Sequence, residues 1–236
     1  MSLVLTLAKR QFRSYFNGPT AYIVLGLVLF VLGFLFWETF FLYDRASVRE
    51  MFNYLRAILV VATPALTMNL IAEEKRTGTI ELLLTMPVTD VQVLAGKFLG
   101  VLGLFGVLVL LTLPYPIAVS TLGPLDWGPV FSGYLGLFLQ GAAMLAIGLM
   151  ASTVSENQIV AFFVALVLTA FFATIGMLVP LLPASLGHVF EYMSFGYHFE
   201  GLARGVVDLR AVVYFTSLTT IAGLLSLYVL ESRRFR

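Results

Sequence analysis

Residues 98–125 read FLGVLGLFGVLVLLTLPYPIAVSTLGPL, and residues 127–155 read WGPVFSGYLGLFLQGAAMLAIGLMASTVS. Each stretch is free of Asp, Glu, Lys and Arg, and only Asp126 separates the two. A helix rises about 1.5 Å per residue, so roughly 20 apolar residues cross a hydrocarbon core about 30 Å thick. Each stretch is therefore long enough to cross a membrane once as a helix.

Four further apolar segments are also long enough to cross a membrane as helices. The six expected spans are residues 21–43, 55–72, 93–121, 130–153, 157–182 and 211–230. Hydrophobic residues make up 60% of the chain and charged residues 11%, whereas a soluble domain carries about 25% charged residues. Spans of this length suit helices rather than the strands of a membrane barrel, so the sequence predicts an all-α membrane protein with six transmembrane helices.

Prolines mark two places in these spans. Pro19-Thr20 is a start signal for the first span, and Pro64 lies inside the second. A proline has no amide hydrogen and disturbs the helix around it, so we expect a kink at Pro64.

The composition excludes several classes of function. A net charge of +1 excludes a strongly basic nucleic-acid-binding protein, and the absence of cysteine excludes thiol catalysis. The nearest fragment to a phosphate-binding loop, Gly96-Lys97, has Val91 where the first glycine belongs. His188 and His198 are the two histidines, and we interpret them as interfacial hydrogen-bonding groups rather than metal ligands. We therefore expect no catalytic residue, metal or directly bound cofactor, and no nucleic-acid partner.

An even number of spans places both termini on the same side of the membrane. Nine of the fourteen Lys and Arg residues fall on that side, and five on the other. The nine are Lys9, Arg10, Arg13, Lys75, Arg76, Lys97, Arg233, Arg234 and Arg236, and the five are Arg45, Arg49, Arg56, Arg204 and Arg210. Because cytoplasmic loops carry the excess of basic residues, we expect both termini in the cytoplasm. The loops are too short to fold on their own, so we expect one transmembrane domain over residues 1–236.

Residues 1–19 precede the first span and combine apolar with basic residues. The apolar residues begin the segment, Lys9, Arg10 and Arg13 follow, and Asn17-Gly18-Pro19 ends it. A cleavable signal peptide has its charges before its apolar region, so this order does not fit one. We expect an amphipathic helix lying in the membrane interface.

The centre of every expected span lacks charged residues. Ion-coupled carriers generally need ionisable groups at depth, so this pattern disfavours a proton- or sodium-coupled transporter. Gln140 is the most polar group near the middle of the fourth span. We interpret it as a helix–helix hydrogen-bonding group rather than a substrate ligand.

The third expected span carries two local signals. Thr89-x-x-Gln92 is a capping box that predicts where its helix begins. Glycines along one side of the span permit close approach of another helix, including one from a second subunit; they are Gly96, Gly100, Gly103 and Gly106.

The connection 73–90, EEKRTGTIELLLTMPVTD, begins with charges and continues with an amphipathic stretch. Gly78 permits a sharp turn, Thr77 or Thr79 can cap a short helix, and Pro87 ends that helix. A helix of about two turns across the cytoplasmic mouth is predicted. The simpler interpretation is a charged loop anchored at the lipid headgroups.

The other long connection, residues 183–210, lies on the outer side and contains apolar residues with few charges. Gly201 and Gly205 punctuate it near its end. It either dips back into the outer leaflet as protein-packed helices or forms a pair of helices on the surface.

The cytoplasmic connection closely resembles the signature of ABC type-2 transporter permeases. The matching residues are Glu73-Glu74-Lys75-Arg76-Thr77-Gly78-Thr79, then Leu82-Leu83-Leu84, Pro87 and Gly96-Lys97-Phe98. The resemblance covers essentially the whole chain, including Tyr15 to Tyr22 before the first span, and His198 to Gly201 with Arg204 to Asp208 before the last. Within the family the chain is most similar to the gliding-motility-type permeases.

The resemblance implies that two six-helix subunits, identical or paralogous, pair on cytoplasmic ATPase subunits that bind ATP and Mg²⁺. It assigns the coupling to that ATPase to Glu73, Glu74, Arg76, Thr77, Gly78, Thr79, Leu82, Leu83 and Leu84. It also implies a re-entrant outer segment, with four gate candidates: His198, Gly201, Arg204 and Gly205.

The function implied is the membrane subunit of an ATP-driven exporter in the bacterial cytoplasmic membrane, in contact with lipids. A related machine would use the same coupling to apply force to an envelope partner protein. The alternatives are a secondary transporter and a membrane scaffold, neither of which couples to ATP.

Overall fold

The computed structural model describes residues 3–43, 47–78, 88–181 and 183–234. In these ranges the regular structure is helical, and six segments are long and apolar enough to cross a membrane. The fold class predicted from the sequence, an all-α membrane protein with six transmembrane helices, is therefore confirmed.

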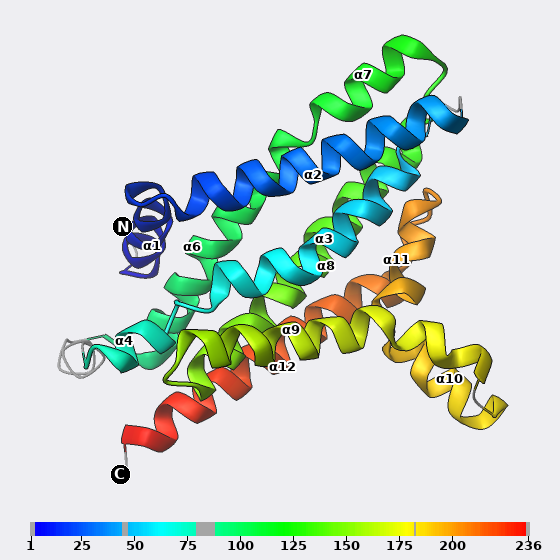
Figure 1. Cartoon of the computed structure of the whole chain (residues 1–236). Helices are drawn as coiled ribbons and strands as arrows, with labels where there is room; N and C mark the ends of the chain where they lie inside the picture. The colour runs from blue at the N-terminus through cyan, green and yellow to red at the C-terminus, as the bar shows by residue number, and fades with distance from the viewer. Residues whose placement is uncertain (1–2, 44–46, 79–87, 182, 235–236) are drawn as a thin grey trace.

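The described helices are named in chain order (Figure 1). They are α1 (Leu3–Asn17), α2 (Thr20–Tyr43), α3 (Arg49–Thr67), α4 (Ala72–Arg76), α6 (Asp90–Leu111), α7 (Pro114–Leu122), α8 (Trp127–Val154), α9 (Gln158–Thr174), the 3₁₀ helix η1 (Ile175–Leu181), α10 (Ala184–Met193), α11 (Phe195–Ala203) and α12 (Leu209–Arg234).

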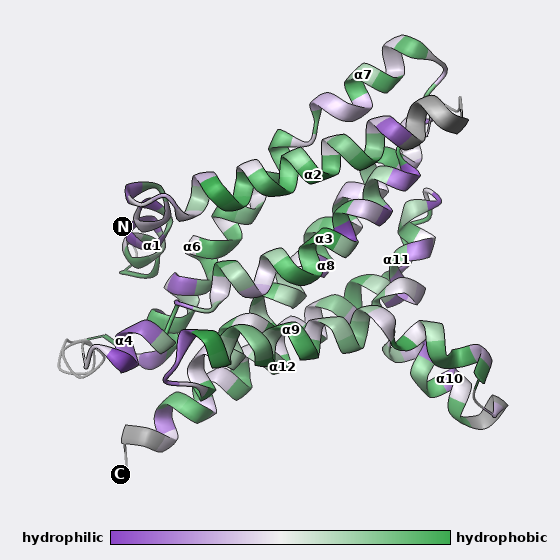
Figure 2. Cartoon of the chain, in the orientation of Figure 1, coloured by the Kyte–Doolittle hydropathy of each residue, from purple (hydrophilic) through white to green (hydrophobic). Residues whose placement is uncertain are grey.

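The long helices run side by side, and both termini lie at the same end of the bundle (Figure 1). We call this end, which carries α1 and α4, the coupling end, and the opposite end, which carries α10 and α11, the far end. In Figure 1 α1 is seen nearly end-on while α2 and α6 run across the view, so α1 lies crosswise to them. Figure 2 shows that apolar residues dominate the middle of the bundle, with hydrophilic residues at α4.

Helix α8 is the central element of the bundle. It packs against α3, α6, α9, α11 and α12. Within its most apolar 18-residue window 72% of residues are buried, against 17% for the last span. Two glycines permit this packing: a Cβ on Gly141 would lie 2.1 Å from the Phe105 ring, and one on Gly148 would lie 2.0 Å from Thr67 Oγ1. Real Cβ atoms do not approach other atoms so closely, so any other residue at these two positions would displace the Phe105 or Thr67 side chain.

The second span begins six residues earlier than predicted, at Arg49 rather than Leu55. Its first turns are amphipathic, with Met51, Phe52 and Leu55 buried at helical spacing. Polar residues between them made this stretch resemble a loop. As a consequence Arg56, which stood at the outer edge of the predicted span, lies about two turns inside the helix.

Helix α3 continues through Pro64 to Thr67. The proline has no amide hydrogen to donate to the carbonyl of Val60, four residues earlier. The hydroxyl of Thr169 on α9 lies 3.2 Å from that carbonyl oxygen and 2.8 Å from the carbonyl of Ala165 in its own helix. The proline therefore creates an acceptor that a neighbouring span can satisfy.

The third and fifth spans are less regular than predicted. The third stops at Leu111 and resumes as α7, because Pro114 has no N–H for the carbonyl of Leu110; the amide of Leu113 donates to that carbonyl instead, at 3.1 Å. The fifth ends in the 3₁₀ turn η1, which contains Pro180. The capping box at Thr89 and Gln92 is present as predicted, with both hydrogen bonds formed.

The glycine face of the third span is covered by α1 of the same chain. A Cβ on Gly96 would lie 2.6 Å from the Cβ of Leu7, and one on Gly100 would lie 2.6 Å from the Cβ of Gln11. Close approach by another helix was therefore predicted correctly. The helix in question is the amino-terminal one, so this part of the face does not serve a second subunit.

The outer connection is folded into helices. Helix α10 lies along η1, whereas α11 packs against α8 and also contacts α9 and α12. Phe195, Phe199 and Leu202 of α11 are fully buried. Of our two alternatives, a pair of helices on the surface is wrong for α11, which forms part of the packed bundle.

Replacement of Gly100 by leucine is expected to push α1 away from α6. The added side chain has no room, and overpacking of this kind costs about 1–3 kcal/mol. We expect a lower thermal midpoint in mild detergent, followed by circular dichroism, and faster proteolysis within residues 3–17. The control is Gly106→Leu, where no atom lies within 4 Å of the added Cβ. Equal midpoints for the two variants would contradict this packing.

Candidate functional site

The coupling end contains a joint between two helices, formed where α3 stops at Thr67 and α4 begins at Ala72. The last carbonyl groups of a helix have no partner within it, and in an apolar protein they must find one elsewhere. At this joint the partners are side chains from three other helices, α1, α6 and α8.

Helix α1 supplies the first of them. The hydroxyl of Tyr15 donates to the carbonyl oxygen of Leu66 at 2.6 Å. Tyr15 is 3% exposed, and burial raises the pKa of its phenol well above the ordinary value. The phenol therefore keeps its proton and remains a donor, which attaches α1 to the end of α3.

Helix α8 supplies the second through Ser152, which is fully buried. Its hydroxyl donates to the carbonyl of Met68 at 3.2 Å and accepts from the amides of Ile71 and Ala72, each at 3.0 Å. One hydroxyl thus satisfies the last turn of α3 and the first amides of α4 together. The side chain of Lys75 adds a hydrogen bond from α4 to the carbonyl of Thr153.

Helix α6 supplies the third through Lys97. Its ammonium donates to the carbonyl of Leu70 at 2.6 Å and to the carboxylate of Glu74 at 2.7 Å. The side chain of Lys97 is 9% exposed and that of Glu74 is 27% exposed, so the pair is largely shielded from solvent. This ion pair connects α4 to α6.

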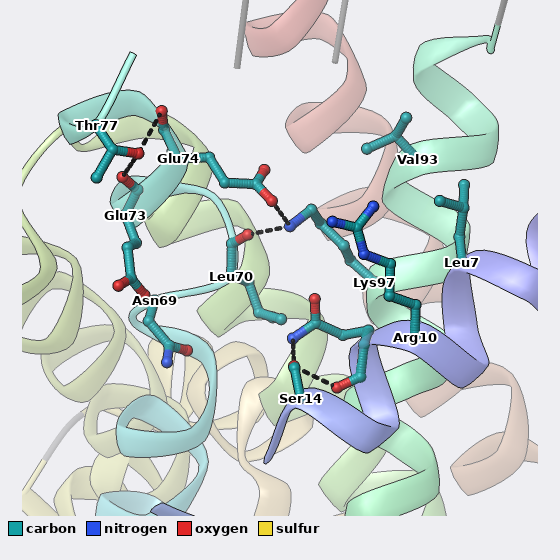
Figure 3. A pocket seen from close by; sticks show the side chains of 11 residues that line it. Leu7, Arg10, Ser14, Asn69, Leu70, Glu73, Glu74, Thr77, Val93 and Lys97 are labelled. Carbon is teal, nitrogen blue, oxygen red and sulfur yellow. Dashed lines mark hydrogen bonds and ion pairs between the residues drawn. The ribbon is translucent and has the colours of Figure 1, made fainter. Parts of the chain in front are cut away.

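A cavity of about 380 Å³ opens between α1, α4 and α6 beside this pair. Figure 3 shows Arg10, Glu73, Glu74 and Lys97 on its walls. The side-chain oxygen of Asn69, also on the wall, is buried and accepts no hydrogen bond from the described residues. The lining of the cavity combines apolar side chains with charged groups of both signs.

The structure brings together five of the predicted coupling residues on or just after α4. Glu73, Arg76, Thr77 and Gly78 are exposed, and Glu74 points inward to Lys97. Gly78 has φ 70°, the left-handed conformation that glycine adopts without strain, so the predicted sharp turn is confirmed. Thr79, Leu82, Leu83 and Leu84 lie outside the described residues, as does the predicted helix of about two turns.

Thr77 follows the last residue of α4, and its hydroxyl donates to the carbonyl of Glu73 at 2.9 Å. Thr77 therefore closes α4. The prediction that Thr77 or Thr79 caps the next short helix concerns residues outside the described ranges and stays a prediction. Tyr15 and Ser152 were not predicted as residues of this site, because nothing in their local sequence signals that they contact α3.

The far end holds the four gate candidates, and two of them have a structural role. The amide of Val206 donates to the carbonyl of Gly201, and the amide of Gly205 donates to that of Leu202. This pair of bonds is a Schellman motif, with Gly205 at φ 95° in its left-handed position. Gly205 therefore terminates α11, and the backbone carbonyl of Gly201 is one of the two acceptors in the motif.

The other two candidates, His198 and Arg204, lie in different environments. His198 is buried, stacks on Tyr214 with ring centroids 3.9 Å apart, and its Nε2 lies 2.8 Å from the carbonyl of Tyr192. Arg204 is exposed and pairs with Glu200, which also accepts from Arg49 at 3.2 Å.

Arg56 lies beneath this surface network. Its Nε donates to the side-chain oxygen of Gln140 at 2.9 Å, and its guanidinium carbon lies 4.2 Å from the centre of the Phe199 ring. The interpretation of Gln140 as a helix–helix hydrogen-bonding group is confirmed. Its partner was missed, because Arg56 stood at the predicted edge of a span.

The Lys97–Glu74 pair is expected to show strong energetic coupling. In a double-mutant cycle with Lys97→Met and Glu74→Gln, we expect a coupling energy of about 1–3 kcal/mol in thermal unfolding, because the pair is shielded from solvent. The matched exposed pair is Arg49 and Glu200, each 49% exposed, for which about 0–1 kcal/mol is expected. Equal coupling in the two cycles would refute the buried character of the joint.

Stability should also depend on the protonation of His198. Burial lowers the pKa of His198, while the Tyr192 carbonyl and Asp208 oppose that shift in part. The unfolded chain then binds the proton more tightly, so stability is greatest above the ordinary pKa of about 6.5 and falls as pH drops toward the folded-state pKa. We expect His198→Phe to reduce the loss in thermal midpoint between pH 7.5 and 5.5. His188→Gln, at a side chain 84% exposed, is the control and should retain the wild-type pH dependence.

Comparison with known proteins identifies the family. Residues 38–230 match the family model described as ABC-2 family transporter protein. The comparison with curated protein sequences gave no match. The matched region begins within α2 and ends within α12, and it includes the joint between α3 and α4 and the packed α11. The chain therefore belongs to the ABC-2 transporter family and is a multi-pass membrane component of a transporter.

Proposed function

We propose that this chain is the membrane subunit of an ATP-driven exporter and couples ATP hydrolysis by a separate subunit to movement of its own helices. The observation that carries the proposal is the attachment of α4 to three spanning helices. It follows α3 directly, pairs with α6 through Lys97 and is capped by Ser152 of α8. A displacement of α4 would therefore be transmitted to three spanning helices, α3, α6 and α8.

The strength of these contacts supports a mechanical role. Hydrogen bonds to charged groups contribute about 1.5–3 kcal/mol each, and neutral ones about 0.5–1.5 kcal/mol. Lys97 and Lys75 make bonds of the first kind, and Ser152 makes bonds of the second. Moving α4 alone would break several of them at once, whereas moving it with the spans would break none.

The exposed residues of the joint form the surface that we assign to the ATPase. Glu73, Arg76 and Thr77 present charge and a hydroxyl at the coupling end. The partner would bind ATP and Mg²⁺, because no phosphate-binding loop occurs in this sequence. Contact of Leu82, Leu83 and Leu84 with that subunit remains a prediction.

The proposal includes an orientation and an assembly. The coupling end would face the cytoplasm of a bacterium, with the chain in the cytoplasmic membrane and paired with a second copy or a paralogue. Because α1 covers Gly96 and Gly100, the pairing must use another surface. Export, or force on an envelope partner, would follow, and likeness to the gliding-motility-type permeases stays a prediction.

One structural feature disfavours the secondary-transporter alternative. Arg56, a charged group about two turns inside the second span, is a fixed cation. A site that binds sodium or a proton at depth needs acidic or neutral acceptors instead.

The replacement Ser152→Ala tests the proposed coupling. It removes the acceptor for the first amides of α4, which costs about 0.5–2 kcal/mol as for other helix caps. We expect assembly with the ATPase subunit to persist, while the stimulation of its ATP hydrolysis by this chain falls about fivefold, the effect of roughly 1 kcal/mol. ATP turnover by the reconstituted complex is the measurement.

The matched control is Ser232→Ala, an exposed serine whose hydroxyl bonds within α12. It should leave stimulation unchanged. Wild-type stimulation in the Ser152→Ala complex would remove the support for coupling through α4.

A further inference from the structure

Arg56 is a cation whose charge is not neutralised by a contacting carboxylate of the described residues. It is the eighth residue of α3, so it lies about 10 Å along the helix from Arg49, at about 1.5 Å per residue. The described residues give its guanidinium one hydrogen-bond acceptor, the neutral side chain of Gln140. A guanidinium has five N–H donors, and leaving such a charge uncompensated within a span is costly.

Glu200, a carboxylate that interacts electrostatically with Arg56, already pairs with other cations. Glu200 accepts from Arg49 and from Arg204, so one negative charge serves two surface cations. Arg56 lies against Phe199, the residue before Glu200, so a third guanidinium group lies at this end of α3 and α11. Among the described residues, these three cations outnumber the two carboxylates beside them, those of Glu200 and Asp126.

The surroundings of Arg56 favour a ligand that is part anionic and part apolar. The ring of Phe199 lies against the guanidinium, and a Cβ on Gly196 would be 3.8 Å from its Nη2. The next turns of α3 expose Ala57 and Val61, the latter at 53%. Nearer the end of the bundle, Arg49 and Arg204 line a separate cavity of about 270 Å³, together with Asp126, whose carboxylate caps α8.

We propose that Arg56, with Arg49 and Arg204, forms a binding site for a phosphate-bearing anion at the far end of the bundle. Guanidinium groups bind phosphate through paired N–H donors, and Arg56 has donors for which the described residues supply no acceptor. The phosphate belongs either to the headgroup of a membrane lipid or to a soluble phosphorylated molecule. Binding at this site does not depend on coupling to ATP, so its test is independent of the test of the function proposed above.

The test uses the purified full-length chain without any ATPase. Its thermal midpoint is measured in neutral detergent against increasing phosphatidylglycerol, with phosphatidylcholine as the zwitterionic control lipid and inorganic phosphate as the soluble probe. For the wild type we expect a saturable rise with phosphatidylglycerol that phosphatidylcholine does not produce. Arg56→Gln should weaken the apparent affinity about tenfold, the effect of one lost hydrogen bond to a charged group.

Arg210→Gln is the matched control, because this exposed arginine lies at the start of α12 outside the cluster. It should bind as the wild type does. If Arg56→Gln does not fold, Arg204→Gln replaces it, since that side chain is 62% exposed, and binding should again weaken. Native mass spectrometry of the wild type gives a second readout, with phosphatidylglycerol adducts that survive where phosphatidylcholine adducts do not.

Each outcome decides the proposal. A saturable effect of phosphatidylglycerol alone supports the site with a lipid ligand, and an equal effect of inorganic phosphate supports it with a soluble one. Equal responses to both lipids without a response to phosphate, an unaltered response in Arg56→Gln, or an equal loss in Arg210→Gln would overturn it.

Discussion

The carbonyl groups at the end of α3 and in its connection to α4 impose the constraint on which the coupling end depends. A buried carbonyl without a partner costs about 1–3 kcal/mol, and an apolar bundle offers little water to satisfy it. Leu66, Met68 and Leu70 receive their hydrogen bonds from α1, α8 and α6 respectively. The need to satisfy this stretch of backbone therefore attaches three other helices to the joint and holds α4 against them.

At the far end, the termination and packing of α11 position the side chains around Arg56. Helix α11 ends in a glycine motif and packs its aromatic face into the bundle, which brings Phe199 against Arg56. The two ends share the central helix α8, which supplies Ser152 at one end and Gln140 nearer the other. A rigid α8 thus connects the joint with the cluster of arginines.

Much of this architecture could be predicted from residue patterns, because span length, helix caps and glycine turns are local properties. The capping box at Thr89 and the turn at Gly78 are examples. Long-range contacts could not be predicted in this way. Ser152 and Tyr15 look like ordinary residues of apolar segments until the fold places them beside α3, and the glycines of α6 indicate close approach without naming the partner. Arg56 was missed because α3 extends beyond its purely apolar stretch.

The central claim is that this chain transmits the work of an ATPase through α4. The most direct measurement is ATP hydrolysis by the complex purified on the tagged chain, compared between wild type and Glu74→Lys, which places two cations together in the joint. The account predicts that an ATPase subunit copurifies with both, and that hydrolysis is stimulated by the wild type but not by Glu74→Lys. A chain that purifies without ATPase activity, or hydrolysis that is indifferent to Glu74, would contradict it.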